Sequence, residues 1–311
     1  MCNSFLFGVN LNFRKRSLIH FEKLNLLCNC KRIAMKALII TLLLVCSTSL
    51  FGQFQFVKDN YYKKGNWFIY WGWNRAAYTT SDIHFKGDNY DFTLENTIAK
   101  DRQSPFSAKT YFKPNSITIP QYNFRIGYFF NDHYNVSLGA DHMKYVMQQN
   151  QTVKINGTIS NSGTSYDGTY TNDDIKLTED FLKFEHTDGL NYENIEVRRF
   201  DVLFGRKNFS LAVNEGFGVG ALVPRTNTTL LNNARYDEFH LAGYGLSTVL
   251  SFNATFFKYF FIQTEWKGGF IHMPDIRTTM NKSDRASQHF LFSQYNVVFG
   301  ANFRIPSKKA K

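Results

Sequence analysis

The stretch IPQYNFRIGYFFNDHYNVSLGADHMKYVM, residues Ile119–Met147, decides the fold. Every second residue from Tyr122 to Phe130 is apolar, and the residues between them are polar or small as far as Gly127; a second alternating run begins at Tyr134. A period of two places the two sets on opposite faces of a strand, and Asn131-Asp132-His133 has the composition of a tight turn. The stretch therefore predicts a β-hairpin with one apolar face and one polar face.

The apolar face of such a hairpin has two possible neighbours. In a soluble sandwich it packs against a second sheet, whereas in a transmembrane barrel it contacts lipid and the polar face lines the lumen. The rest of the sequence favours the barrel, because alternating segments recur along the chain. We expect eight strands, over Asn66–Thr79, Tyr122–Phe130, Tyr134–Met147, Asn194–Gly205, Phe209–Val223, Phe239–Phe256, Phe260–Met273 and Phe290–Ile305.

The connections between these segments alternate in length. Short turns near residues 132, 207 and 258 separate longer connections over 80–117, 150–193, 225–237 and 274–287. Short turns at one end and long loops at the other are typical of an outer-membrane barrel with an even number of strands. The sequence thus predicts an all-β fold: an eight-stranded antiparallel up-and-down transmembrane β-barrel with long extracellular loops.

Two of the long connections have features of their own. Residues 80–117 contain short alternating runs at Ile83–Phe85 and Tyr90–Leu94, which predict a hairpin above the membrane. The connection 150–193 is rich in Asn, Thr, Gly, Ser and Asp, and its middle, Ser160–Asp174, is expected to be mobile.

The amino-terminal region has the composition of a secretory signal. Residues 35–52 combine a positive start at Lys36, the apolar core Ala37–Val45 and an exit of small residues, with cleavage after Ser49 or before Gln53. We expect 35–52 to be a signal peptide and 53–311 to be the barrel, with lipidation at Cys46 as the alternative. Residues 1–34 are then either a spurious extension upstream of the true start or an unusually long amino-terminal region of the signal.

Charge and cysteine content exclude several classes of function. The net charge of +11 falls to +5 over 53–311, which holds 29 basic and 24 acidic residues without a basic patch, so no nucleic-acid partner is expected. All four cysteines lie at or before Cys46, so the mature barrel is expected to have no disulfide, cysteine nucleophile or cysteine metal site. We expect no cofactor and no metal site.

Over about residues 65–305 the chain resembles the small eight-stranded outer-membrane barrels, such as the OmpA transmembrane domain and OmpW-like proteins. The hairpin GYFFNDHYNVSLGADHMKYV is similar in style to those of Bacteroidetes-type bacteria. The resemblance implies a place in the bacterial outer membrane and contact with its lipids and lipopolysaccharide, but no single activity. One departure is the tail: such barrels usually end on an aromatic residue, whereas Phe303 is followed by Arg-Ile-Pro-Ser-Lys-Lys-Ala-Lys.

The inward faces of the expected strands carry charged side chains. Eight strands enclose an interior just wide enough for side chains, and buried charges must be paired, so we expect a polar network that plugs the lumen. Gly216, Gly218 and Gly220 form a small inward row that leaves room for it, and a bulge is expected near Arg198. The alternative is a narrow OmpW-like channel for small solutes. The expected network residues are Arg125, Asp141, Arg199, Asp201, Glu265, Lys267 and Arg304.

Outward aromatic residues are expected at the membrane interfaces, where such barrels carry aromatic girdles. Tryptophans dominate this set, and three of the four lie in the first strand. The expected girdle residues are Trp67, Trp71, Trp73, Trp266, Tyr128 and Phe303.

The sequence leaves the molecular role open between a structural or interaction barrel, a lipid A-modifying enzyme and the narrow channel for small solutes. A structural or interaction barrel, favoured as a monomer, would use its outer loops for adhesion or ligand capture. Calcium at Asp167, Asp173 and Asp174 is conceivable there, although their spacing fits no EF-hand. A lipid A-modifying enzyme would need a nucleophile and a base. Of the histidines expected at the outer ends of strands, His142, His240 and His272, none stands in a catalytic motif, so no catalytic residue is assigned.

Overall fold

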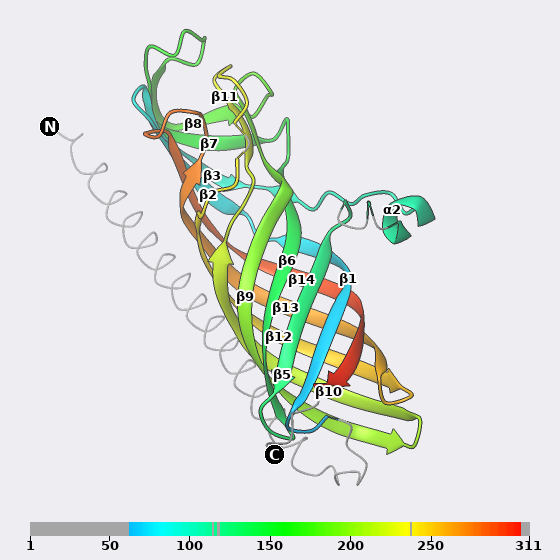
Figure 1. Cartoon of the computed structure of the whole chain (residues 1–311). Helices are drawn as coiled ribbons and strands as arrows, with labels where there is room; N and C mark the ends of the chain where they lie inside the picture. The colour runs from blue at the N-terminus through cyan, green and yellow to red at the C-terminus, as the bar shows by residue number, and fades with distance from the viewer. Residues whose placement is uncertain (1–61, 114, 117–118, 237, 306–311) are drawn as a thin grey trace, which may run out of the picture. The chain divides into compact units, whose positions relative to one another are not determined.

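The computed structural model describes residues 62–113, 115–116, 119–236 and 238–305 (Figure 1). The expected signal peptide, residues 35–52, and the segment 1–34 lie outside these described residues. Within the described ranges, no helix is both long enough and apolar enough to cross a membrane.

Eight antiparallel strands form a closed ring. Each pairs with the next, and β1 closes the ring against β14 in a continuous register from Asn66↔Arg304 to Tyr78↔Phe292. The prediction of an eight-stranded up-and-down barrel is therefore confirmed. The ring strands are β1 (Asn66–Tyr78), β5 (Tyr122–Phe129), β6 (Tyr134–Met147), β9 (Leu182–Arg206), β10 (Phe209–Leu222), β12 (Gly243–Phe256), β13 (Phe260–Arg277) and β14 (Arg285–Arg304).

The outer wall of the ring is apolar and the interior is polar. Leu138 and Phe252 are both 59% exposed, whereas Arg125, Ser251 and Asn253 are buried. A soluble protein has the opposite arrangement, and a closed barrel leaves no unpaired strand edge for lipid to solvate. The wall is therefore the lipid-contacting surface of a transmembrane β-barrel, and barrels of this kind span the bacterial outer membrane.

Strand β9 contains a bulge, but not at the expected place. The register with β10 passes from Leu211↔Phe204 to Ala212↔Val202, so Leu203 is the extra residue. Above this bulge, Phe200 and Arg198 face inward and are buried, whereas Arg199, which lies between them, faces outward and pairs with Asp201. The expected bulge near Arg198 is wrong, and with it the inward positions expected for Arg199 and Asp201.

The barrel continues at its outer end into a second folded region, which we call the head. It comprises β2, β3, β4, β7, β8 and β11 together with the outer ends of β6, β9, β13 and β14 (Figure 1). Its sheet runs from β14 through β2, β3 and β7 to β8. The added strands are β2 (Ser81–Lys86), β3 (Tyr90–Thr97), β4 (Ala99–Lys100), β7 (Thr152–Ile159), β8 (Gly168–Lys176) and β11 (Asn227–Leu230), and a short helix α2 (Ala108–Phe112) precedes β5.

The head has an apolar core of its own. Phe85, Phe92 and Phe184 are at most 1% exposed, and the ring of Phe85 lies 5.3 Å from that of Phe92 and 5.6 Å from that of Phe184. The predicted hairpin in 80–117 is confirmed as β2 and β3. The mobile segment expected over Ser160–Asp174 is wrong from Gly168 onward, where β8 begins. The long connections are thus largely folded β-structure.

His186 lies inside the head core and makes its stability sensitive to acid. The ring is fully buried beside Tyr145 and Phe184, with Nδ1 2.9 Å from Thr226 Oγ1. Burial disfavours the charged imidazolium and lowers the pKa of His186 to about 3. The unfolded chain takes up this proton near pH 6.5, so the stabilising contribution is complete above pH 6.5 and is lost as the pH falls toward 3.

We expect the head to lose about 2 kcal/mol of stability between pH 7 and pH 5, because each pH unit below the unfolded pKa costs about 1.4 kcal/mol. Amide hydrogen exchange of the head strands over this pH range measures the loss. His186→Gln should reduce this pH dependence, whereas the matched change at His84, which is half-buried at the surface of the head beside Asp91, should retain it. An identical pH dependence in His186→Gln and the parent would contradict the assignment.

Candidate functional site

The middle of the lumen holds six charged side chains, three basic and three acidic, which we call the lumen network. They come from β5, β6, β9 and β13, and each is at most 2% exposed. The members are Arg125, Asp141, Glu196, Arg198, Glu265 and Lys267.

Glu196 is the centre of the lumen network because it contacts all three cations. Its Oε1 lies 2.8 Å from Arg125 Nη2 and 2.7 Å from Lys267 Nζ, and its Oε2 lies 2.6 Å from Arg198 Nη2. Arg198 Nη1 also lies 2.5 Å from Glu265 Oε1, and Lys267 pairs with Asp141. Each charge has an opposite charge in contact, so the cluster is formally neutral.

Neutral polar groups complete the network. The Tyr70 hydroxyl accepts from Arg125 Nε at 3.0 Å and from Arg198 Nη2 at 3.1 Å, and donates to Glu265 Oε1 at 3.1 Å. The Asn194 amide accepts from Arg125 Nη2 at 2.7 Å and donates to Asp141 Oδ2 at 3.0 Å. These bonds hold the charged groups in fixed positions, which is the condition under which buried ions are tolerated.

Two glycines of β10 make room for the network. A Cβ on Gly216 would lie 2.7 Å from Arg198 Cγ, and a Cβ on Gly218 would lie 2.8 Å from Glu196 Cγ. Both distances are too short for real side chains, so a larger residue would displace the charged groups. The inward glycine row has the space-making role that the sequence predicts.

An aromatic layer closes the lumen on the short-turn side of the network. It comprises Tyr62, Phe68, Phe129, Phe200 and Phe261, none more than 7% exposed. The rings of Tyr62 and Phe200 are 3.9 Å apart, and the Tyr62 hydroxyl donates to Asn253 Oδ1 at 2.8 Å. Between this layer and Arg198 lies a cavity of about 20 Å³, which has room for about one water molecule.

The outer side of the network is closed as well. Tyr192 and Phe292 lie there with ring centres 6.2 Å apart, and both belong to the head core. The Tyr192 hydroxyl donates to the Gly245 carbonyl at 3.1 Å. The lumen is thus filled in three layers: aromatic, charged and again apolar.

Four of the seven expected lumen residues lie in the network: Arg125, Asp141, Glu265 and Lys267. The other three do not, because the bulge at Leu203 and the strand end change their positions. Arg199 and Asp201 pair with each other at 2.7 Å, outside the network, and Glu215 faces Arg199 across the β9–β10 pair. Arg304 is exposed at the end of β14.

Sequence reasoning missed four residues of the site: Tyr70, Asn194, Glu196 and Arg198. The signal for the last three is present, since Asn194-Ile-Glu-Val-Arg198 alternates strictly between polar and apolar. The expected bulge near Arg198 ends this alternation too early, because the bulge in the structure lies five residues later, at Leu203.

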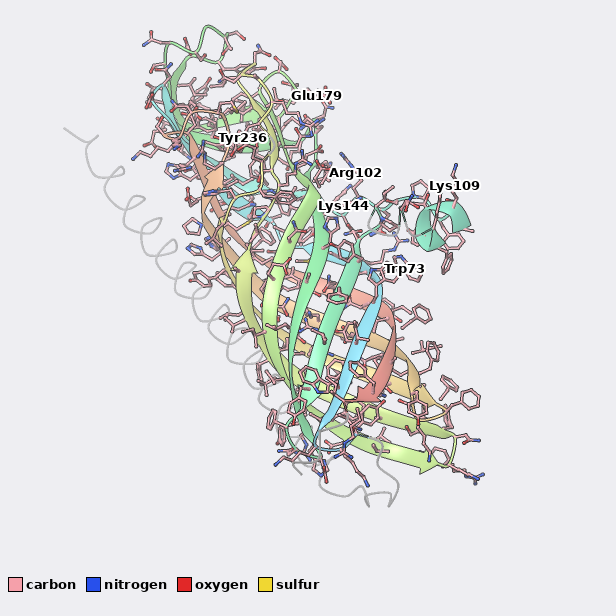
Figure 2. All side chains as sticks on the ribbon, viewed as in Figure 1. Trp73, Arg102, Lys109, Lys144, Glu179 and Tyr236 are labelled. Atoms are coloured by element: carbon pink, nitrogen blue, oxygen red, sulfur yellow. The ribbon has the colours of Figure 1, made fainter. Side chains whose placement is uncertain are left out.

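The expected girdle residues all belong to the outward-facing positions of the ring. Trp67, Tyr128 and Phe303 are neighbours in register near the short-turn end, with the rings of Trp67 and Tyr128 5.0 Å apart. Trp73 lies toward the outer end of β1 (Figure 2). Trp71 lies two residues before Trp73 on β1, and Trp266 is exposed on the outer face of β13.

The histidines considered for catalysis are separate and each has its own neighbours. The His142 ring stacks on Tyr122 at 4.9 Å, and its Nδ1 lies 2.8 Å from Asn191 Oδ1. His240 Nε2 lies 2.9 Å from Asp275 Oδ2. His272 has ring contacts with its strand neighbours.

The loop acids considered for calcium have other partners. Asp167 bonds to Ser162, Asp173 accepts from its own strand at Thr171 N, and Asp174 pairs with Lys154 at 2.9 Å. No group of three or more potential metal ligands occurs among the described residues.

No protein-family model matches the sequence, and a comparison with curated proteins gives no match. Among solved structures, the chain is similar to the outer membrane protein OprG from Pseudomonas aeruginosa, at 12% identity over 79% of this chain and 100% of that one, with a TM-score of 0.39. It is also similar to Ail, the attachment invasion locus protein of Yersinia pestis, at 11% identity over 77% and 99%, with a TM-score of 0.29. For AlkL in lipid bilayers the identity is 11% over 82% and 97%, and the TM-score is 0.35.

Proposed function

We propose that this chain is a non-conducting outer-membrane barrel whose role is structural or interactive, with the head as its surface for adhesion or for binding an extracellular ligand. The lumen serves as a rigid core that carries the head above the membrane. The barrel works as a monomer, in contact with outer-membrane lipids and lipopolysaccharide, and needs no cofactor.

The observation that supports this proposal is the filled lumen. Three layers of buried side chains cross it. In the charged layer, each side chain contacts at least one side chain of opposite charge. A solute path would have to separate ion pairs in a region of low dielectric constant, which costs several kcal/mol for each ion. This favours a plug over a narrow channel.

We expect the purified protein to give no reproducible single-channel conductance in planar lipid bilayers, because buried side chains fill the lumen at the aromatic and charged layers. A porin reconstituted in the same way serves as the positive control. Heat-modifiable gel mobility shows that the inserted protein is folded. Sizeable, reproducible conductance from folded protein would reject the plugged lumen and favour the channel.

The enzyme alternative has less support from the geometry. A lipid A-modifying barrel needs a nucleophile and a base within hydrogen-bond reach of each other. The hydrogen-bond partner of His142 is an amide oxygen, and that of His240 is a carboxylate. Mass spectrometry of lipid A from cells with and without the protein distinguishes the two functions, since only the enzyme changes the acyl pattern.

A further inference from the structure

A segment between β4 and β5, which we call the arm, leaves the barrel wall at its outer end. It comprises the described residues 101–113, 115–116 and 119–121 and contains α2, which Figure 1 shows standing away from the strands. Asp101 fixes both ends of the arm: its carboxylate accepts from Ala76 N at 3.0 Å and bonds to the side-chain amides of Gln103 and Gln121. The arm is therefore a built structure held at a set height on β1.

The arm lies at the outer edge of the membrane belt, the apolar band of the barrel wall that lipid acyl chains contact. The rings of Tyr111 and Phe112 lie 5.5 and 5.3 Å from the ring of Trp73, which faces outward on β1 (Figure 2). Strands rise about 3.3 Å per residue and tilt by about 40°, so in a belt about 25 Å tall Trp73 lies about 18 Å beyond Asn66 and Ala76, which binds Asp101 of the arm, lies about 25 Å beyond it. The arm thus extends sideways from the barrel where acyl chains give way to headgroups.

The arm carries apolar side chains that no other part of the described protein covers. Phe106 is 75% exposed, Phe112 is 62% exposed and Ile119 is 54% exposed. They continue the apolar surface that Trp73 and the outer wall present to lipid. Large apolar side chains exposed at this level match the interfacial segments of membrane proteins.

The arm carries more basic than acidic side chains, so its net charge is positive. Lys109 and Lys113 are exposed: Lys109 lies in α2, and Lys113 is the C-cap residue directly after Phe112. Lys100 and Arg102 precede them, and Asp101 is the single carboxylate of residues 100–121. Lysine beside phenylalanine in one short segment suits an interface, where the ring enters the acyl layer and the ammonium group reaches the phosphates.

We propose that the arm is an anchor in the outer leaflet: Phe106 and Phe112 insert among acyl chains, and Lys109 and Lys113 bind the phosphate groups of anionic lipids. The inference depends on the membrane insertion of the barrel but not on the plugged lumen. The anchor fixes the depth and orientation of the barrel, and with it the height of the head above the membrane.

The depth of the arm is tested with a fluorescent NBD group on single cysteines in the full chain, whose four native cysteines are changed to serine. The label is placed at Phe112, at Phe252 on the barrel wall and at the exposed Ser165 in the head. We expect nitroxide-labelled phosphatidylcholine to quench positions 112 and 252, and aqueous iodide to quench 165 several-fold more than 112. Iodide access at 112 equal to that at 165 overturns the anchor.

The phosphate contact is tested with the label at Phe112 in vesicles containing brominated phosphatidylglycerol or brominated phosphatidylcholine. Lys109→Gln with Lys113→Gln should lower the preference for phosphatidylglycerol about fivefold per lysine, since a basic side chain near an anionic surface contributes about 1 kcal/mol. The matched change of two exposed head lysines, Lys86→Gln with Lys176→Gln, should leave the preference unchanged. Equal preference in both double variants overturns the phosphate contact. Gel mobility confirms that each variant is folded.

Discussion

Glu196→Gln is expected to lower the free energy of unfolding of the barrel by about 3–5 kcal/mol, the usual cost of removing one partner from a buried ion pair. Glu196 is fully buried and contacts Arg125, Arg198 and Lys267 within 2.8 Å. Glutamine keeps the shape of the side chain but removes its charge, so three cations share the two remaining carboxylates. Urea unfolding of the barrel in lipid vesicles, followed by gel mobility, measures the change.

The matched control for this substitution is Glu179→Gln. Glu179 is exposed in the head, between β8 and β9 in the sequence, and belongs neither to the lumen network nor to the lipid-facing wall. We expect its effect to stay within about 0.5 kcal/mol, as for most surface substitutions. If Glu196→Gln and Glu179→Gln unfolded at the same urea concentration, the charge balance of the lumen network would not contribute to stability.

The second large effect is expected at the aromatic layer. Phe129 is 1% exposed, and its ring lies 5.4 Å from that of Tyr62, 5.8 Å from that of Phe68 and 5.7 Å from that of Phe200. Phe129→Ala should destabilise the barrel by about 3–5 kcal/mol, because the layer loses buried apolar contacts and gains a cavity next to an existing one.

The neighbouring residue supplies the control. Phe130 is 42% exposed and its ring contacts Tyr134 at 6.3 Å, outside the aromatic layer. We expect Phe130→Ala to cost about 1 kcal/mol, since an exposed ring loses little packing. Equal effects of the two substitutions, measured by the same urea unfolding, would show that the layer is not packed as described.

The sequence was sufficient to predict the ring because each ring strand is an alternating run, and lipid on one side enforces the alternation. It predicted Arg125, Asp141, Glu265 and Lys267 as lumen residues for the same reason. It failed at Arg199 and Asp201, because a one-residue bulge inverts every position beyond it and its location depends on the partner strand.

Apart from the β2–β3 hairpin, the head was not predicted, for a different physical reason. Its strands are short, and their pairing joins segments far apart in the sequence, as when Tyr90 lies opposite Ile159. Composition alone makes residues 150–193 look like a polar loop, although Ile155, Phe181 and Phe184 are fully or almost fully buried. Isolated apolar residues in a polar stretch become a core only when a long-range sheet brings them together.

Strand β14 follows all other described strands in the sequence, and it takes part in two closures at once. Residues 292–304 complete the seam with β1, while Arg285–Gln288 pair with β2 as the first step of the head sheet. During synthesis, neither the sealed cylinder nor the surface sheet can be completed until this last segment is made. A nascent chain cut before β14 would leave unpaired edges on β13, β1 and β2, and the surface sheet would lack the strand from which it extends.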